Sequence, residues 1–255
     1  MTTRSSFQNG STPTVVLVHG AFTDASSWAG VIADLQATGI PVTAVANPLR
    51  GLATDAAYLT DVAAAIDGPV LLVGHSYGGV VVTRAGDQAG NVVGLVYVTA
   101  FALAVGESVL DVTGRFPDSL LGPALRPATF RTGDGQEAVE LYLRTDRFAA
   151  VFAADLPEHL TSVAAAAQRP IAAVAFEESS PGASWQTLPS WYVVATADQA
   201  IHPAAQRFMA QRAGADTIEA DGSHAIALSQ PAAVAGHIRA AAIATTYGNA
   251  KRSTR

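Results

Sequence analysis

The chain has 255 residues, 49% of them hydrophobic, and it carries a formal charge of −6 without any cysteine. This composition excludes disulfide bonds, thiolate zinc sites and a cysteine nucleophile, and an acidic balance without a sizeable basic run argues against a nucleic-acid partner. No apolar run reaches the roughly 18 residues of a membrane span, and the polar N-terminal segment is unlike a signal peptide, so we expect a single globular protein of the cytoplasm.

Val-rich runs alternate with Ala-rich segments over the first hundred residues. The runs predict strands at 14–20, 41–47, 69–75 and 91–100, and the segments predict helices at 26–39, 54–67 and 77–90. The first helix is expected to stop at Gly39, because glycine readily adopts the left-handed turn that ends many helices. Thr54 and Asp55 are expected to cap the second helix. Strands that are apolar on both faces, alternating with helices, predict an α/β fold with a parallel sheet covered on both sides.

The stretch "LLVGHSYGGVVV" (71–82) places one serine among several glycines, directly after a predicted strand. It contains the pattern G-x-S-x-G, from Gly74 to Gly78, between that strand and a helix, which is the context of a nucleophile elbow. A very sharp turn there would raise the Ser76 hydroxyl above the sheet edge and leave no room for larger neighbours. The helix N-terminus would bring free N–H groups to the same place. An ordinary glycine-rich turn is the alternative interpretation.

Residues 101–185 interrupt the alternation of strands and helices. They carry scattered Pro and Gly, several Phe, and an amphipathic piece at 135–156 that predicts helix. In such sheets ligands bind outside the carboxyl ends of the strands, so an insertion that leaves one of these ends would cover the site. We therefore expect a core domain made of residues 1–100 and 186–255, with residues 101–185 as a helical cap that sets which substrates are accepted.

The alternation resumes with strands at 188–198 and 216–222 and helices at 203–214 and 231–246, and two polar residues follow these strands. His224 lies in a polar loop after the last strand, and Asp198 lies at the end of the strand before it. The chain order Ser76, Asp198, His224 is the order of nucleophile, acid and base in catalytic triads that are built on a nucleophile elbow. Asp216 begins its strand and so lies at the wrong end, while Asp221 is expected to brace the loop or to face solvent.

An oxyanion hole needs two N–H donors. The residue after the nucleophile, Tyr77, supplies one of them. The other is expected from the loop after the first strand, "HGAFTDASSW" (19–28), with Ala21 as the first choice and Phe22 as the second.

Together, "HGAFTDASSW", "GHSYGG", "ATADQAIHP" and "GSHAIALSQP" resemble the α/β-hydrolase superfamily, and within it the branch of plant methylesterases, hydroxynitrile lyases and bacterial carboxylesterases. The resemblance implies a mostly parallel eight-stranded sheet, a helical cap and chemistry that uses no cofactor and no metal. It also implies that Ser76, Asp198 and His224 form the triad and that Ala21 and Tyr77 donate to the oxyanion.

Several chemistries of this superfamily differ at single residues. Dehalogenases and epoxide hydrolases place a carboxylate where this chain has Ser76, and dienelactone hydrolases use a cysteine. Plant hydroxynitrile lyases carry a lysine where this chain has Ala225. A cofactor-free haloperoxidase or perhydrolase and a non-catalytic receptor both stay open as alternatives.

We therefore predict a serine esterase that cleaves a small to medium, mainly apolar carboxylic ester through an acyl-enzyme on Ser76. A lactone is one candidate for this substrate. The small-molecule ester is the expected partner, without nucleic acid or membrane, and a homodimer is one candidate for the oligomeric state. Aromatic residues are predicted to form the pocket walls: Phe22, Tyr77, Phe101, Phe116, Phe130, Phe148 and Phe152.

Overall fold

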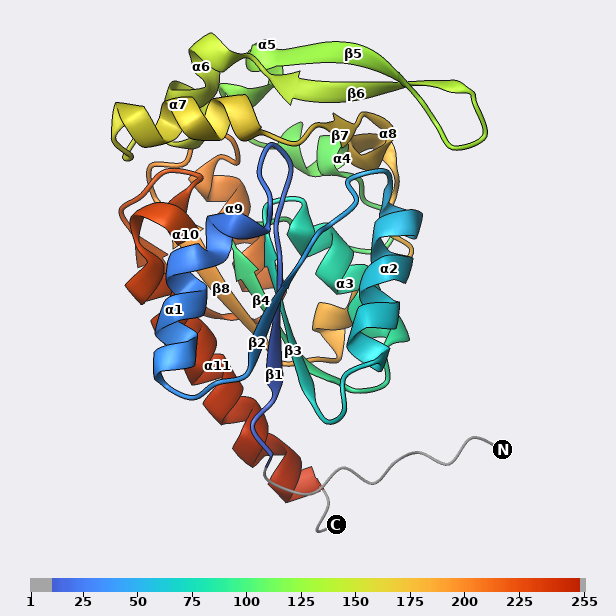
Figure 1. Cartoon of the computed structure of the whole chain (residues 1–255). Coiled ribbons are helices and arrows are strands. Elements are labelled where there is room, and N and C mark those ends of the chain that lie inside the picture. Colours follow the sequence, from blue (N-terminus) through green and yellow to red (C-terminus); the bar gives the residue numbers. More distant parts are fainter. Residues whose placement is uncertain (1–10, 253–255) are drawn as a thin grey trace.

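The computed structural model of the protein describes residues 11–252. A twisted sheet lies at its centre, with helices on both faces (Figure 1). Its strands are β1 (Thr14–Val18), β2 (Val42–Val45), β3 (Val70–His75), β4 (Val92–Val98), β8 (Ser190–Ala195) and β9 (Asp216–Ala220). They run in the order β2-β1-β3-β4-β8-β9, and every neighbouring pair is parallel. The α/β class and the parallel sheet are thus confirmed.

The expected number of eight strands is wrong for the described residues, whose central sheet has six. Each of the six corresponds to one of the strands predicted from the sequence. The remaining strands, which lie between residues 125 and 172, pair with one another in a separate sheet and do not extend the central one.

Two apolar cores cover the two faces of the central sheet. Along β1, Val15 and Leu17 belong to one core and Val16 and Val18 to the other, because successive side chains of a strand point to opposite faces. The first core is completed by α1 (Ala29–Ala37) and α11 (Pro231–Arg252), and the second by α2 (Leu52–Ala64), α3 (Gly78–Gln88) and α9 (Pro203–Arg212). The short η1 (Ala25–Trp28) precedes α1, and α10 (Ile226–Ser229) precedes α11. Among the described residues, no helix is long and apolar enough to cross a membrane.

The ends of two helices test the predicted caps. Gly39 has a φ of 74° just after α1, as expected for a left-handed helix end. The predicted caps Thr54 and Asp55 are wrong, because α2 already begins at Leu52. The N–H of Leu52 donates to the carboxylate of Glu178, so a side chain distant in sequence supplies the acceptor that local residues were expected to provide.

Residues 101–185 are here called the cap. Most of them lie over the carboxyl ends of the central strands (Figure 1), and the last few pack against α3. Their helices are α4 (Val109–Thr113), α5 (Leu121–Ala124), α6 (Thr145–Phe152), α7 (Glu158–Ala167), α8 (Val174–Glu177) and the short η2 (Ser184–Gln186). Their strands are β5 (Leu125–Arg131), β6 (Glu137–Leu143) and β7 (Ile171–Ala172), which form an antiparallel sheet in the order β5-β6-β7.

The cap is therefore mixed, and the expectation of a purely helical cap is wrong. The piece at 135–156 splits into β6 and α6. In the first half, "EAVELYL", residues alternate between the two faces of a hairpin that pairs Leu125 with Leu143 and Arg131 with Glu137. The same letters also fit one side of a helix, and pairing with β5 decides between the two. The division into a core domain and a cap domain stays a prediction.

Candidate active site

Ser76 lies at a sharp turn between β3 and α3. Its φ of 54° falls in the left-handed region, which a residue with a Cβ adopts only at an energetic cost. A Cβ on Gly74 would lie 2.5 Å from the carbonyl oxygen of Gly78, and a Cβ on Gly78 would collide with the carbonyl oxygen of Val18. Strand and helix thus touch at Gly74, which is the steric reason inferred from the sequence. Gly78 is required for a different reason, because α3 there packs against the end of β1.

His224 and Asp198 lie side by side at the carboxyl end of the sheet. Nδ1 of His224 donates to Oδ2 of Asp198 over 2.7 Å, and both side chains are buried. Burial by itself raises the pKa of Asp198, but the charge and hydrogen bond of His224 and the hydroxyl of Thr99 hold that pKa below its ordinary value. The carboxylate therefore stays ionised and fixes the imidazole tautomer that carries its proton on Nδ1.

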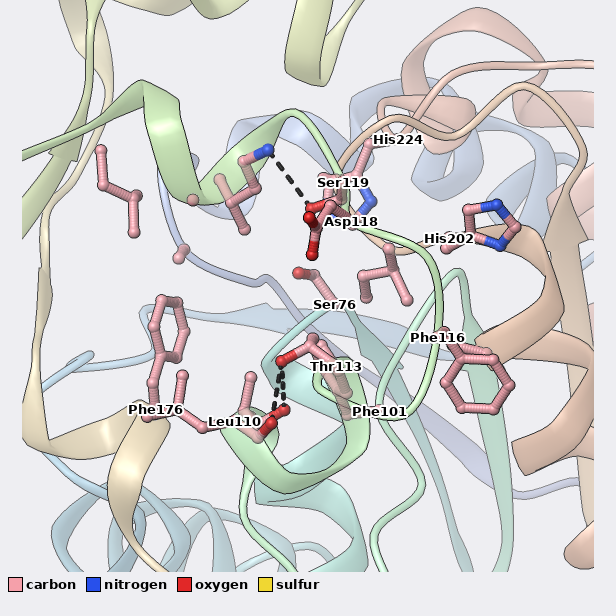
Figure 2. Close-up of a pocket in the computed structure, with 18 of the residues that line it drawn as sticks. Ser76, Phe101, Leu110, Thr113, Phe116, Asp118, Ser119, Phe176, His202 and His224 are labelled. Carbon is pink, nitrogen blue, oxygen red and sulfur yellow. Dashed lines mark hydrogen bonds between the residues drawn. The ribbon is translucent and has the colours of Figure 1, made fainter.

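With its proton on Nδ1, the His224 imidazole has Nε2 free to accept another proton. Ser76 and His224 line the same cavity (Figure 2). In residues 11–246 no hydrogen bond within 3.5 Å joins the Ser76 hydroxyl to the imidazole, and such contacts commonly tighten only when a substrate is bound. Chemically, this arrangement can remove the serine proton and stabilise the imidazolium that results.

Five donors converge on the carboxylate of Asp198, and His224 is one of them. Oδ1 accepts the N–H groups of Ala200 at 2.7 Å and Ile201 at 3.0 Å. Oδ2 also accepts the hydroxyl of Thr99 and, at 2.8 Å, the amide of Gln206. Sequence reasoning missed Thr99 and Gln206. A polar residue at the end of the "VYVT" strand was a usable signal for Thr99, but no sequence signal pointed to Gln206.

The two other acids considered for the triad do not lie against the His224 ring. Asp216 is exposed at the start of β9. Asp221 is also exposed, and its carboxylate accepts the hydroxyl of Thr196 at 3.4 Å, which is the loop-bracing role considered for it. Of the three acids, Asp198 is the one that contacts the His224 ring.

Two backbone N–H groups next to Ser76 have no acceptor among the described residues, those of Ala21 and Tyr77. The N–H of Phe22, the second choice for the oxyanion hole, donates to the carbonyl oxygen of Arg169 at 2.9 Å and is therefore occupied. Ala21 lines the same cavity as Ser76, and Tyr77 directly follows Ser76 in the turn. These are the two donors that the sequence analysis favoured, and their role in catalysis stays a prediction.

The side chain of His19 orients the peptide that carries the Ala21 N–H. Asn47 donates its backbone N–H to Nε2 of His19 over 3.1 Å, so the ring proton is on Nδ1, which donates to the carbonyl oxygen of Gly20 over 2.8 Å. Burial lowers the pKa of His19 to about 4, which keeps the ring neutral and this tautomer in place. In a trans peptide the Gly20 carbonyl and the Ala21 N–H point in opposite directions, so fixing one aims the other.

His75, the residue before the nucleophile, braces the loop of His224. Its Nε2 donates to the backbone carbonyl oxygen of His224 over 2.9 Å, and the two ring centroids are 4.7 Å apart. Burial, and then the charge of His224, lowers the pKa of His75 to about 3, so the ring is neutral. In the sequence, His75 stands inside the G-x-S-x-G pattern, and no signal there predicts this contact with the His224 loop.

The cavity has a volume of about 440 Å³ and mostly apolar walls, with α4, the loop after it and α5 on one side. Of the residues predicted for its walls, Phe22, Phe101, Phe116 and Phe152 line it. Phe176, on α8, lines it too and was missed, because "VAFE" carries no signal that separates a pocket residue from a core residue.

Phe148 was also predicted to form a wall, and this prediction is wrong, because Phe148 does not line the cavity. It is 1% exposed and packs on the inner side of α6 against Phe152, with ring centroids 5.1 Å apart. Phe130 and Tyr77, also predicted as walls, do not line the cavity either. Phe130 lies on β5 beneath the guanidinium of Arg50, and the Tyr77 ring is buried.

Polar side chains on the cavity wall include Thr113, Asp118, Ser119 and His202. Nδ1 of His202 accepts the N–H of Ala204 at the start of α9. Within the described residues, no group of three or more His, Asp or Glu side chains is arranged to hold a metal ion.

Comparison with protein families gives one match: a model of the alpha/beta hydrolase family covers residues 15–237. A comparison with curated proteins found no match. Similar solved structures include a pyrethroid hydrolase from Sphingobium faniae, with 22% identity over 90% of this chain and 97% of that one and a TM-score of 0.73.

Two further similar structures are esterases by name. Polyneuridine aldehyde esterase shares 20% identity over 91% of this chain and 99% of its own, with a TM-score of 0.77. A methylesterase from Arabidopsis shares 17% identity over 90% of this chain and 98% of its own, with a TM-score of 0.74. At these identities the likeness is one of fold.

Proposed function

The chain belongs to the alpha/beta hydrolase family, and we propose that within it the protein is a serine esterase that cleaves small to medium, mainly apolar carboxylic esters. The observation that carries this proposal is the hydrogen bond from His224 to the buried Asp198 at the edge of the cavity that Ser76 lines. The named activities of the similar structures, which are hydrolysis of pyrethroids and esterase action on other esters, support the same reaction class.

The proposed reaction begins with proton transfer from the Ser76 hydroxyl to Nε2 of His224. Oγ attacks the ester carbonyl carbon, and the oxyanion accepts hydrogen bonds from the N–H groups of Ala21 and Tyr77. As the C–O bond to the alcohol breaks, His224 returns its proton to the leaving oxygen. Water then enters by the same route, gives a proton to His224 and releases the acid from Ser76.

The strained turn at Ser76 supports the assignment of the nucleophile. A non-glycine residue in left-handed geometry is retained only where the surrounding structure enforces it, and here β3 and α3 do so. A cavity of about 440 Å³ with Phe22, Phe101, Phe116 and Phe176 on its walls supports a mainly apolar substrate, in the size range of small-molecule sites. The homodimer and the cytoplasmic location stay predictions.

The decisive experiment replaces Ser76 by Ala. Hydrolysis of an aryl ester should fall by about 10⁴–10⁶ in kcat, as for other serine triads, and a fluorophosphonate should label the wild type at Ser76 and leave the variant unlabelled. Ser119→Ala is the matched control, since it removes a second serine hydroxyl from the same cavity. Near-normal hydrolysis by a folded Ser76→Ala protein, or ligand binding without hydrolysis by the wild type, would contradict the proposal.

A further inference from the structure

The wall of the cavity carries a charge that the proposed reaction does not use. Besides the imidazole of His224, the ionisable side chains on the wall are those of Asp118 and His202, and among the described lining residues there is no Lys or Arg. Asp118 lies on the loop between α4 and α5. Figure 2 shows Asp118 and Ser119 above Ser76, with the side chain of Asp118 directed into the cavity.

Among the described side chains, none with a positive charge forms an ion pair with this carboxylate. The ion pairs within the described residues join other side chains, and Asp118 takes part in none of them. The nearby imidazole of His202 has Nδ1 occupied as an acceptor for the N–H of Ala204, so its other nitrogen carries the proton of the neutral ring. It can donate a hydrogen bond but brings no charge in that form.

The N-terminus of α9, which also reaches the cavity, offers an anion no free N–H group from its first turn. Its first free N–H groups are satisfied locally: Ala204 donates to the His202 ring, and Ala205 and Gln206 donate to the His202 carbonyl oxygen. Besides the two N–H donors proposed for the oxyanion, the cavity wall therefore offers an anion only the imidazoles of His224 and His202 and the hydroxyl groups of its Ser and Thr residues. A carboxylate on the substrate would face Asp118 with no Lys or Arg among the described lining residues to compensate its charge.

We propose that Asp118 selects substrates by charge: the enzyme prefers esters whose one arm ends in a cationic group, accepts neutral esters, and discriminates against esters that carry a second, free carboxylate. This inference rests on the proposed esterase function and narrows its substrate class. The apolar walls hold the hydrocarbon part of the ester, and the Asp118 carboxylate at the exposed side of the cavity attracts the charged end.

The experiment compares esters of one shape and three charges. The alcohol-arm series is acetylcholine, its neutral analogue with carbon in place of nitrogen, and the acetate ester of hydroxypropionate. The acyl-arm series is the aryl esters of trimethylammonio-butyrate, of its neutral carbon analogue and of glutarate. In the wild type we expect kcat/KM to favour the cation over the neutral analogue by roughly two- to fivefold in at least one series, as for a partly exposed charge pair. The anion should be the poorest substrate of that series.

The variants then assign this preference to one side chain. Asp118→Asn should bring the cation-to-neutral ratio close to one, and Asp118→Lys should make the anion better than the cation. Asp134→Asn is the matched control: it removes the same charge from the turn between β5 and β6, outside the cavity. Raising the salt concentration should weaken the wild-type preference, because screening shortens the reach of an exposed charge.

A cation-to-neutral ratio that Asp118→Asn leaves unchanged in both series, or a wild type that prefers the anion, would overturn the inference. Binding of the same esters to the Ser76→Ala variant, measured by calorimetry, separates this result from the esterase proposal. A charge preference in Kd that disappears in the Ser76→Ala, Asp118→Asn double variant supports the selection of charge even if the wild type hydrolyses none of the esters, an outcome that would refute the esterase function alone.

Discussion

At the scale of single residues, the proposed chemistry depends on side chains that hold the reacting groups and do not react themselves. His19 aims a peptide, His75 braces a loop, and Thr99 and Gln206 complete the surroundings of a carboxylate. Both histidines are buried and have pKa values lowered to about 4 and about 3 respectively. They are thus neutral donors over the pH range in which a histidine base ordinarily works.

Replacing Asp198 by Asn should lower kcat by about 10⁴, the loss seen when the analogous acid of a well-studied triad is changed, because the amide favours the wrong tautomer of the histidine. Steady-state hydrolysis of an aryl ester measures the effect. Asp221→Asn is the control, since Asp221 is exposed and contacts Thr196. A harmless Asp198→Asn together with a crippling Asp221→Asn would show that the acid has been assigned wrongly.

Replacing His19 by Leu should lower kcat by up to roughly 10², less than or equal to the loss of one oxyanion donor. The reason is that the Gly20 carbonyl loses its 2.8 Å donor and the Ala21 N–H its fixed direction. KM should change little, and binding of a boronate transition-state analogue should weaken in parallel with kcat.

His19→Asn is the conservative variant for this test, because its amide can replace the Nδ1–H donor. Restored kcat and analogue binding in His19→Asn would support a positioning role. Equal losses in both variants, with ester and analogue binding weakened alike, would show that His19 acts only in the packing of the fold.

The residues of the site that could be predicted from sequence are those that belong to local patterns. Ser76 could be predicted because the glycines that its turn requires lie two positions before and after it in the sequence. Asp198 and His224 could be predicted because each follows a strand, which places both at one edge of the sheet. Gln206 was invisible, because its contact with Asp198 depends on how α9 packs on the sheet. Phe148 and Phe152 could not be told apart, since the choice between core and cavity depends on the rotation of α6.

At the scale of elements, the cap and the loop of His224 are tied together. The N–H of Ser223 donates to the carboxylate of Asp155 over 3.0 Å, and the Ser223 hydroxyl donates both to that carboxylate and, over 3.1 Å, to the carbonyl oxygen of Phe152. The Phe152 ring meets the His224 ring edge-on, with centroids 5.0 Å apart. The sequence analysis assigned the cap to substrate choice alone, and these contacts indicate that it also supports the base.

Asp155→Ala should therefore lower kcat by roughly tenfold for every ester, as expected when a charge-assisted hydrogen bond is lost.

Phe116→Ala, by contrast, removes a cavity wall and should alter the ratio of kcat/KM between short and long acyl chains, by about 1–3 kcal/mol per methylene that fits or clashes. A chain-length series of aryl esters measures both effects. An Asp155→Ala variant that changes only chain-length preference would contradict the supporting role and leave the cap with substrate choice alone.

The cap itself shows why elements are harder to predict than patterns. The core strands are easy to predict from the sequence, because both faces of a covered parallel sheet are apolar and each strand is therefore a continuous apolar run. The β5–β6 hairpin is half exposed, so its letters mix polar and apolar residues in a way that also suits a helix, and its partner strand decides the outcome.

At the scale of the whole molecule, charged contacts fasten the cap to the core in two places. Arg50, just before α2, pairs with Glu140 of β6 over 2.7 Å. Arg212, at the end of α9, pairs with Glu107 of the cap over 2.8 Å, and Glu107 also accepts Arg115 over 2.6 Å. The Glu107 side chain is only 11% exposed, so removing its charge, which leaves the half-buried Arg212 without a partner, costs more than breaking a surface ion pair.

Stability should depend on pH through Glu107. Burial alone raises the pKa of this carboxyl, but the hydrogen bonds from Arg212, Ala104 and Arg115 outweigh it and lower the pKa to about 2. A carboxyl with a lowered pKa in the folded state stabilises the fold at pH values above its unfolded pKa, and this contribution is lost as the pH falls through the folded pKa. Glu107→Gln should therefore reduce the free energy of unfolding at pH 7 by roughly 1–3 kcal/mol.

The difference between wild type and Glu107→Gln should stay constant from pH 7 to about 5 and shrink as the pH falls from the unfolded pKa of about 4.3 towards about 2. Urea unfolding at a series of pH values measures it. Glu219→Gln is the control, because Glu219 pairs with Arg207 in an exposed position, where an ion pair contributes about 1 kcal/mol or less. A difference for Glu107→Gln that is the same at pH 2.5 and pH 7 would mean that the side chain stabilises the protein by packing, and that the ionic link between cap and core adds nothing.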